Sequence, residues 1–275
     1  MTGIATSSPR SYLFAPGHDP KLLERVYTAG ADAVLLDLED AVPASEKDRA
    51  RAMVVEALRR ERAWVRVNAP GTERCAADVE AVAGLALGIR IPKVESAEEV
   101  AWVAARAPGL PLGCTIESAR GVSAAREIAA APQTAHLIYG NADFCADLRI
   151  DGGEIPTLYA RSHVVLASRA AGIAPPCDGA YTRIADVEGL RREAAFARSL
   201  GFFGKSAIHP RQIAAIHDVF RPSAAHVAWA RRTLEAFEAA GGAATRTAEG
   251  EMVDVPVAER ARQILRLAER EERGT

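Results

Sequence analysis

Short apolar runs alternate with amphipathic stretches along most of this chain, and this alternation limits the fold more than any other sequence feature. Eight runs are typical of strands, and helical patterns separate them. The expected strands are Ser11–Ala15, Ala33–Leu38, Trp64–Asn68, Ile89–Val94, Leu112–Ile116, His136–Tyr139, a weaker Ala180–Ile184 and Ser206–Ile208. Parallel strands need helical crossovers, and about 250 residues is the usual length of a (β/α)8 barrel. The 275 residues therefore predict the α/β class and a (β/α)8 TIM barrel.

The alternation stops near residue 221. Residues 222–240 form one helical pattern, Gly241–Gly242 begins a flexible linker, and a last apolar stripe runs from Val257 to Ala268. We expect a catalytic barrel over residues 1–221 and a helical extension over residues 222–275. Because the last stripe must be buried, the extension would cap its own barrel or cross to a neighbouring subunit as a lid.

Charge and composition exclude several kinds of partner. The chain has 34 Lys and Arg against 36 Asp and Glu, so no overall positive charge favours nucleic acid or an anionic membrane. No apolar run approaches the roughly 20 residues of a membrane span, and the first residues lack the apolar core of a secretory signal. The 4 cysteines form no Cys-x-x-Cys pair, which is typical of buried thiols. We expect a cytoplasmic protein that binds neither nucleic acid nor membrane.

Acidic residues follow three of the expected strands, at the end of a barrel where reactive groups lie. Glu39 and Asp40 follow the second strand, Glu117 the fifth and Asp143 the sixth. Converging carboxylates repel one another unless a hard divalent cation joins them, and oxygen ligands suit Mg2+ or Mn2+. Zinc is not expected, because the histidines form no ligand pair. A structural alternative stays open, in which Glu117 or Asp143 bonds backbone donors at a helix start.

Basic residues also lie in or next to apolar strands. Arg66 is a charge inside a strand, which is costly unless the side chain meets an anion. That anion is a substrate carboxylate or an acid of the cluster, in a structural salt bridge. Lys93 and Lys205 are each placed on a strand; either could form a Schiff base, but charge pairing is favoured with so many carboxylates nearby. His209, after the last strand, orders the barrel mouth or binds an anion.

Seven ordered motifs, covering nearly the whole chain, resemble the citrate lyase β-subunit-like (CitE-like) family of the HpcH/HpaI aldolase group, which is related to malyl-CoA and citramalyl-CoA lyases. The motifs are Arg10–Gly17, Gly30–Val42, Val65–Asn68, Ile91–Ser96, Ile116–Gly121, Asp186–Leu190 and Gly204–Pro210. The resemblance implies a TIM barrel assembled as a homotrimer or hexamer. It also implies Mg2+-dependent carbon–carbon lyase chemistry on an acyl-CoA and a small α-keto acid, namely glyoxylate, pyruvate or oxaloacetate.

The resemblance also assigns roles to individual residues. It implies that Glu117 and Asp143 bind the metal and that Glu117 also binds the substrate. It further implies that Arg66 holds the keto acid carboxylate. It further implies that Glu39 and Asp40 bind the metal's waters, that Phe14 and Arg25 contact CoA, and that Asp254 from a neighbouring subunit transfers the proton.

One position departs from the family pattern. Relatives that act on CoA esters commonly carry a basic residue where this chain has Asp19, and a carboxylate facing phosphates is unfavourable, although Lys21 could compensate. Two alternatives therefore stay open. One is a CoA-independent, HpaI-type pyruvate aldolase. The other is a partner-dependent citrate lyase β subunit whose substrate is carried by an acyl carrier protein.

Overall fold

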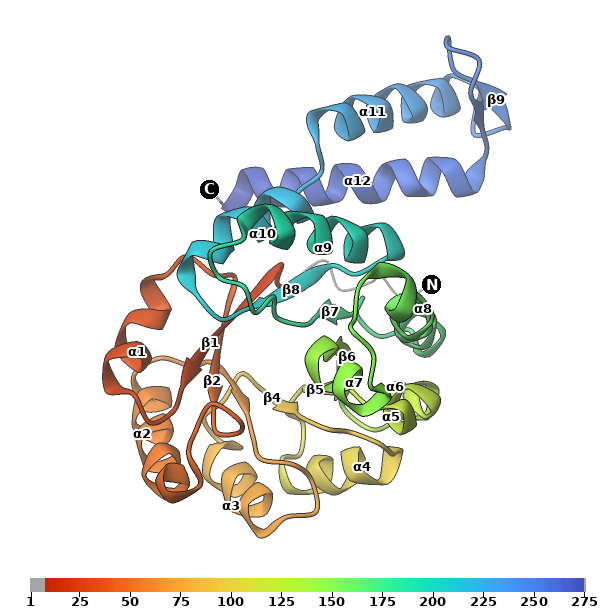
Figure 1. The fold of residues 1–275 in the computed structure, drawn as a ribbon. Helices are drawn as coiled ribbons and strands as arrows, with labels where there is room; N and C mark the ends of the chain where they lie inside the picture. Colours follow the sequence, from red (N-terminus) through yellow and green to blue (C-terminus); the bar gives the residue numbers. More distant parts are fainter. Residues whose placement is uncertain (1–7, 275) are drawn as a thin grey trace. The chain divides into compact units, whose positions relative to one another are not determined.

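Eight parallel strands close into a barrel, in which each strand pairs with the next along the chain and β8 pairs with β1 (Figure 1). The computed structural model describes residues 8–274, with side chains through Glu269. The strands are β1 Ser11–Pro16, β2 Ala33–Asp37, β3 Trp64–Arg66, β4 Gly88–Ile91, β5 Leu112–Ile116, β6 Thr134–Tyr139, β7 Cys177–Asp178 and β8 Gly204–Ala207. The predicted (β/α)8 barrel is confirmed.

Helices surround the strands and bury their apolar faces against them (Figure 1). They are α1 Pro20–Arg25, α2 Lys47–Arg60, α3 Glu73–Val82, α4 Ala97–Arg106, α5 Ala119–Ser123, α6 Ala125–Ala129, α7 Asn141–Leu148, α8 Glu154–Ala171, α9 Val187–Leu200 and α10 Ile213–Phe220, with 3-10 turns at Val26–Thr28, Ala44–Glu46 and Pro210–Gln212. Local signals place their starts. Ser96 and Glu99 form a capping box at α4, and Asp186 caps α9.

The seventh strand is not where the sequence predicts it. Only Cys177 and Asp178 pair with the neighbouring strands, whereas Ala180–Ile184 follows them as a loop. The strand is too short to show an apolar run, and it comes directly after two prolines, whose nitrogens cannot donate hydrogen bonds. Its pairing is set by the closed barrel rather than by a local pattern.

β3 and β4 end two and three residues earlier than predicted. β3 ends at Arg66 and β4 at Ile91, although Val67 and Val94 beyond them are fully buried. The apolar pattern therefore continues into the loops that fold over the barrel end. As a result Lys93 is not on a strand but in the loop after β4, where its φ of 52° turns the chain.

The chain divides into two compact units between His217 and Asp218. The second unit contains α11 Ala224–Ala239, β9 Thr245–Arg246, β10 Met252–Val253 and α12 Val255–Gly274. Phe237, Val253 and Ala258 form a buried cluster within it. The two short strands pair in an antiparallel hairpin, where the sequence suggests only a linker.

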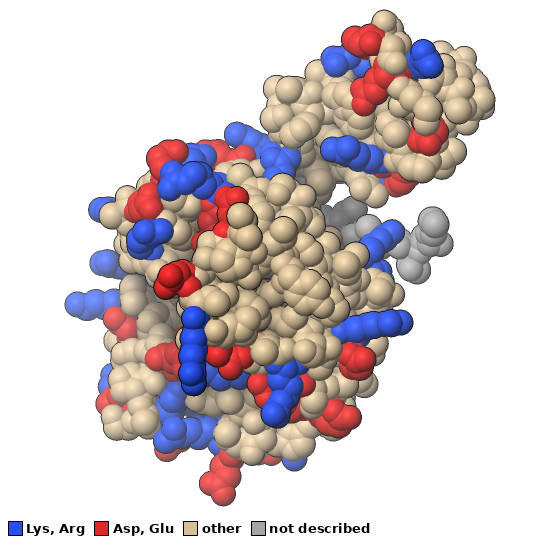
Figure 2. All heavy atoms as spheres, turned by 45° about the vertical axis from the view of Figure 1, so that its right-hand side comes forward, with Lys and Arg blue, Asp and Glu red and all other residues tan. Residues whose placement is uncertain are grey.

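Within residues 8–274, no helix combines the length and apolar composition needed to cross a bilayer. On the face drawn in Figure 2, basic and acidic side chains are interspersed, and no continuous basic area covers that face. This distribution agrees with the net charge of −2.

Candidate active site

A pocket of about 120 Å³ lies at the carboxyl ends of the barrel strands. Its lining includes Phe14, Arg66, Arg90, Thr115, Glu117, Asp143 and Ser206. Enzymes of this fold carry out their chemistry at this end of the barrel. The pocket is smaller than the roughly 300–1,000 Å³ of sites for drug-sized ligands, so it suits a small acid.

Two carboxylates reach this pocket from neighbouring strand ends. Glu117 follows β5 and is 7% exposed, and its Oε1 accepts a hydrogen bond from the Lys93 backbone N–H at 2.7 Å. Asp143 is exposed and lies in the first turn of α7, directly after β6. Between them, a Cβ added at Gly140 would lie 2.5 Å from Glu117 Cβ. Only glycine therefore lets this loop approach Glu117 so closely.

The electrostatics of this carboxylate pair favour a bound cation. Burial, and then the negative charge of Asp143, raises the pKa of Glu117 to about 7. Within the described residues, no group of three or more His, Cys, Asp or Glu side chains is arranged to hold a metal ion. Mg2+ commonly binds one or two carboxylates and keeps water or substrate oxygens at its other positions. Glu117 and Asp143 therefore fit Mg2+ and do not resemble a structural zinc site.

Arg66, the last residue of β3, is held by acids of the β2 end. Its Nε and Nη2 donate to the two carboxylate oxygens of Asp37 at 2.7 Å each, and its Nη1 lies 2.8 Å from Glu39 Oε2. Although burial opposes it, pairing with Asp37 and Glu39 raises the pKa of Arg66. The guanidinium carbon also lies 4.8 Å from the centroid of the Phe14 ring. Arg66 thus forms the salt bridge that the sequence left open, and it lines the pocket as well.

The loop that carries Glu39 and Asp40 is held by two lysines. Lys93 Nζ donates to Glu39 Oε1 at 2.6 Å and to Asp40 Oδ1 at 3.1 Å. The buried Lys47 Nζ donates to the backbone oxygens of Leu38 and Glu39 at 2.7 and 2.6 Å. Lys93 therefore holds the two acidic side chains, and Lys47 holds the backbone of the same loop.

Lys205, the second lysine that could form a Schiff base, is also paired with acids. Lys205 is fully buried in β8, and its Nζ donates to Asp178 Oδ2 and Glu193 Oε1 at 2.5 Å each. Neither Lys93 nor Lys205 is among the residues that line the pocket. Charge pairing accounts for both lysines.

Asp19 and Arg25, which lie at the two ends of α1, are outside the pocket lining. Arg25 is exposed at the end of α1. Asp19 caps the same helix, because its Oδ1 accepts hydrogen bonds from the backbone N–H groups of Lys21 and Leu22 at 2.9 and 3.1 Å. The departure at Asp19 thus has a local structural reason.

Asp254 and His209 both act as helix caps in the structure. Asp254 lies in the second unit, where its Oδ1 accepts a hydrogen bond from the Val257 N–H at 3.2 Å at the start of α12. His209 Nδ1 accepts from the Arg211 N–H at 3.1 Å, before a 3-10 turn. The structure thus gives each a local contact, and His209 is not among the residues that line the pocket.

Asp37 and Arg90 were not among the site residues predicted from the sequence. Asp37 is fully buried and binds Arg66, its register partner on the next strand. Arg90 is 3% exposed in β4 and lines the pocket. A charge between Ile89 and Ile91 is the same signal that identified Arg66, so Arg90 could have been found. The role of Asp37 needed the register of the strands.

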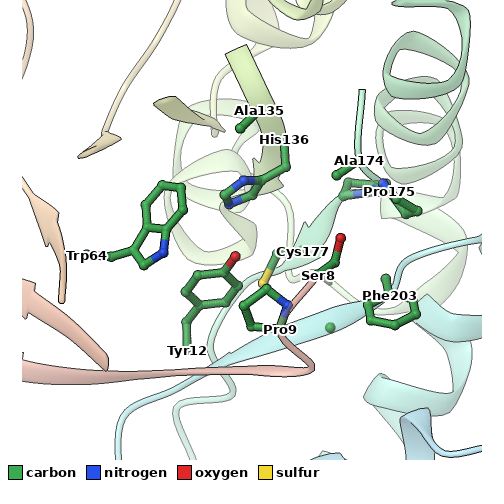
Figure 3. Close-up of a pocket in the computed structure, with 12 residues that line it drawn as sticks. Ser8, Pro9, Tyr12, Trp64, Ala135, His136, Ala174, Pro175, Cys177 and Phe203 are labelled. Atoms are coloured by element: carbon green, nitrogen blue, oxygen red, sulfur yellow. The ribbon is translucent and has the colours of Figure 1, made fainter. Parts of the chain in front are cut away.

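A larger pocket, of about 320 Å³, lies at the opposite end of the barrel, by the amino ends of the strands (Figure 3). Tyr12, Trp64 and His136 point toward one another there, with ring centroids 5.1 to 6.0 Å apart. Burial, and then the charge of Arg90, lowers the pKa of His136 to about 3, so this ring is neutral at physiological pH. An aromatic cluster at this end is typical of barrel stability rather than catalysis.

Comparison with protein families identifies two matching models. The model described as HpcH/HpaI aldolase/citrate lyase matches residues 10–210. A second, described as a carbon–carbon bond lyase of the TIM-barrel fold, matches residues 160–270. Together they cover the barrel and most of the second unit.

Individual proteins of known name are similar over almost the full length. Citrate lyase subunit beta of Escherichia coli is 38% identical over 286 residues, which cover 96% of this chain and 94% of that protein. A (3S)-malyl-CoA thioesterase of Cereibacter sphaeroides is 39% identical over 270 residues, 94% of each chain. A crystal structure of CitE from Mycobacterium tuberculosis with magnesium, acetoacetate and coenzyme A superposes with a TM-score of 0.85 and 36% identity, covering 96% of this chain and 99% of that one.

Proposed function

Because this chain belongs to the HpcH/HpaI aldolase/citrate lyase family, and thereby to the carbon–carbon lyases, we propose that it is a Mg2+-dependent enzyme that joins or separates an acyl-CoA and a small α-keto acid. The observation that carries the proposal is the convergence of Glu117, Asp143 and Arg66 on one small pocket. The similar CitE structure supports it, because that protein binds magnesium, acetoacetate and coenzyme A.

Each residue of the pocket has its own proposed role. Glu117 and Asp143 would hold Mg2+, or Mn2+ in its place, which when bound stabilises negative charge on the keto oxygen as a Lewis acid. Arg66 has five N–H donors; Asp37 accepts two and Glu39 lies against a third, which leaves two for a substrate carboxylate. Glu39 and Asp40 would accept hydrogen bonds from water beside the cation.

The thioester partner is proposed to be acyl-CoA. Its nucleotide would lie outside the small pocket, near the exposed basic residues Lys21 and Arg25 on α1. Asp19 is engaged with the backbone of that helix, so Lys21 and Arg25 are the side chains proposed to meet the phosphates. The similarity to citrate lyase subunit beta keeps one alternative, a substrate carried by an acyl carrier protein.

We expect the purified chain to condense acetyl-CoA with glyoxylate, pyruvate or oxaloacetate only when Mg2+ is present. Asp143→Asn should remove this activity, whereas Asp147→Asn, a change on the same helix outside the pocket lining, should keep it. The assay separates acetyl-CoA from the hydroxyacyl-CoA product by chromatography, with and without a chelator. Turnover that survives the chelator would contradict the metal assignment. Activity only with an acyl carrier protein thioester, or only on a hydroxy-keto acid without thioester, would select one of the two alternative functions.

We also propose that Asp254 completes the site from a neighbouring subunit of a homotrimer or hexamer, exchanging a proton with the acyl group. The apolar face of α8 supports such an assembly. Ile155, Tyr159 and Leu166 are 85, 73 and 67% exposed there, at spacings that place them along one side of the helix. An apolar stripe of this kind is typical of a contact between subunits.

Mixed oligomers test this arrangement. Asp254→Asn and Glu117→Gln should each be inactive alone, because one lacks the proton donor and the other a metal ligand. Co-expressed with different tags and purified through both, the mixed assembly should regain part of the activity, since some sites then combine an intact Glu117 with an intact Asp254. Mixed assemblies that form but stay inactive would show that Asp254 does not act between subunits.

A cytoplasmic location is part of the proposal. The cysteines Cys75, Cys114, Cys145 and Cys177 are free thiols, and three of them are buried. Free thiols are typical of a reducing compartment.

A further inference from the structure

The pocket at the amino ends of the strands is space that the side chains of the barrel leave unfilled (Figure 3). Its volume is about 320 Å³, within the roughly 300–1,000 Å³ of sites for small-molecule ligands. Protein interiors are close-packed, and voids larger than a water molecule are few. Aromatic rings that served packing alone would close this space. The pocket is therefore a candidate for a binding site.

Flat apolar surfaces form the walls of this pocket. Tyr12 and His136 are stacked, with 24° between their ring planes and 5.5 Å between their centroids. Trp64 meets both rings edge-on, at interplanar angles of 84° and 73°. Phe203 and Pro175 lie across from Trp64 in Figure 3. Aromatic rings pack in offset stacks or edge-to-face, so walls of this kind favour a flat ring as the ligand.

The lining of the pocket carries no ionised side chain. None of the described residues that line it is Asp, Glu, Lys or Arg. His136 is neutral, because burial and the charge of Arg90 lower its pKa to about 3, and burial raises the pKa of Tyr12, which keeps its proton. The Arg90 guanidinium carbon lies 5.1 Å from the Tyr12 ring centroid, and its charge opposes a bound cation. An anion would be buried with no basic side chain in the lining, so the pocket suits an uncharged molecule.

One polar group of the lining lacks a hydrogen-bond partner. His136 is 6% exposed, and its Nε2 makes no hydrogen bond with any described residue. Buried polar groups are usually paired, so an unpaired one beside a cavity points to a ligand that pairs with it. A neutral imidazole has one nitrogen that donates and one that accepts. A primary amide both donates and accepts, so it suits either nitrogen.

We propose that this pocket is a second ligand site, which binds an uncharged molecule with one or two flat rings and an amide-like polar group. The ring packs between the walls that Tyr12, Trp64 and Phe203 provide, and the polar group exchanges hydrogen bonds with His136. Among the described residues, none lines both this pocket and the pocket of Glu117. The proposal is therefore independent of the lyase function, and its test needs neither Mg2+ nor a thioester.

Benzamide, benzoate and benzamidine are matched probes, because they share one ring and differ in charge. Calorimetry without Mg2+ should show benzamide binding to the unmodified chain with a Kd of about 1 mM or tighter. Benzoate and benzamidine, an anion and a cation at neutral pH, should bind at least about tenfold more weakly. Toluene keeps the ring and lacks the amide, so it should bind about 3- to 10-fold more weakly than benzamide.

Trp64 reports whether a probe enters this pocket. The chain has 3 tryptophans, and neither Trp102 nor Trp229 lines the pocket. With fluorotryptophan incorporated, benzamide should move the fluorine NMR signal of Trp64 and leave the other two signals in place. Trp64→Phe identifies which signal belongs to Trp64.

Two variants and a control test the proposed contacts. Ala174→Leu should abolish benzamide binding, because the larger side chain takes up the pocket, and its melting temperature should equal or exceed that of the unmodified chain. Ala171→Leu, an exposed change outside the lining, should leave benzamide binding as it is. His136→Met, a residue of similar size, should lower benzamide affinity about 3- to 10-fold and leave toluene affinity within about twofold.

Several results would overturn the second site and leave the lyase function untouched. Benzamide that binds no more tightly than benzoate and benzamidine would refute the uncharged ligand. Benzamide binding that persists in Ala174→Leu, or that leaves the Trp64 signal in place, would put the probe elsewhere on the chain. No binding to the unmodified chain would refute the site, and binding that appears only after residues 1–7 are deleted would make the chain's own N-terminus the occupant instead.

Discussion

Glutamine in place of Glu117 is expected to lower kcat by about a thousandfold or more, because one of two carboxylates for Mg2+ is lost and Lewis-acid stabilisation is worth several kcal/mol. The fold should survive the change. The glutamine amide oxygen can still accept the Lys93 backbone N–H at the position of Oε1. Steady-state kinetics over a range of Mg2+ concentrations, together with circular dichroism, measures both effects.

The same variant should lose a pH dependence that the parent chain shows. Burial and the charge of Asp143 raise the pKa of Glu117 from 4.5 to about 7, so the folded chain holds this proton more tightly than the unfolded chain. The stability that Glu117 contributes is therefore full below its unfolded pKa and is lost as pH rises toward 7. Mg2+ needs the ionised carboxylate, so it should raise the melting temperature more near pH 8 than near pH 5.5.

Thermal melts of Glu117→Gln provide the test, with Glu154→Gln, an exposed surface change, as the control. We expect Glu117→Gln to show little Mg2+ response at either pH, and Glu154→Gln to behave as the parent. A Glu117→Gln chain that keeps full Mg2+-dependent turnover would refute the assignment of this residue to the metal.

Methionine in place of Arg66 is expected to destabilise the fold by about 3–5 kcal/mol, because it leaves the fully buried Asp37 without its cation. Catalysis should be lost as well, since no guanidinium remains for the substrate carboxylate. Urea unfolding followed by fluorescence measures the stability change.

The double variant Arg66→Met with Asp37→Asn separates the two effects. Removing both charges should restore much of the lost stability, because no uncompensated ion stays buried. Asparagine also keeps an oxygen for the Glu39 backbone N–H. Activity should stay lost, because the substrate contact is absent in both variants. Equal stability of the single variant and the parent chain would mean that this ion pair does not hold the β2 and β3 ends together.

Sequence patterns predicted a strand well where the residues on either side of it mark its two ends. Leu112–Ile116 has the same bounds in the sequence prediction and in the structure, because a buried apolar run lies between Pro111 and Glu117. β7 was placed wrongly, because two residues after a pair of prolines contain no periodic pattern. Lys93 was placed on a strand, because buried Val94 continues the apolar pattern into the loop.

The candidate site, too, could be predicted in part from local sequence. Its chemistry was visible in residue types at strand ends, and the structure brings Glu117, Asp143, Arg66 and Phe14 around one pocket. Whether each of them acts as proposed stays a prediction, as do the roles of Glu39 and Asp40. Arg25 lies outside the pocket lining and Asp254 belongs to the second unit, and their proposed roles depend on a cofactor and a neighbouring subunit.

The sequence by itself determined the eightfold alternation, the acidic strand ends and the seven motifs of the family, because these depend on short-range spacing along the chain. Only the tertiary structure decided how the charges pair. Asp37 meets Arg66 through strand register, Gly140 admits Glu117 through a close approach, and Arg90 meets a hydroxyl group and two aromatic rings. The physical reason is that the cost of a buried charge depends on which neighbours surround it, and barrel closure brings those neighbours from distant parts of the chain.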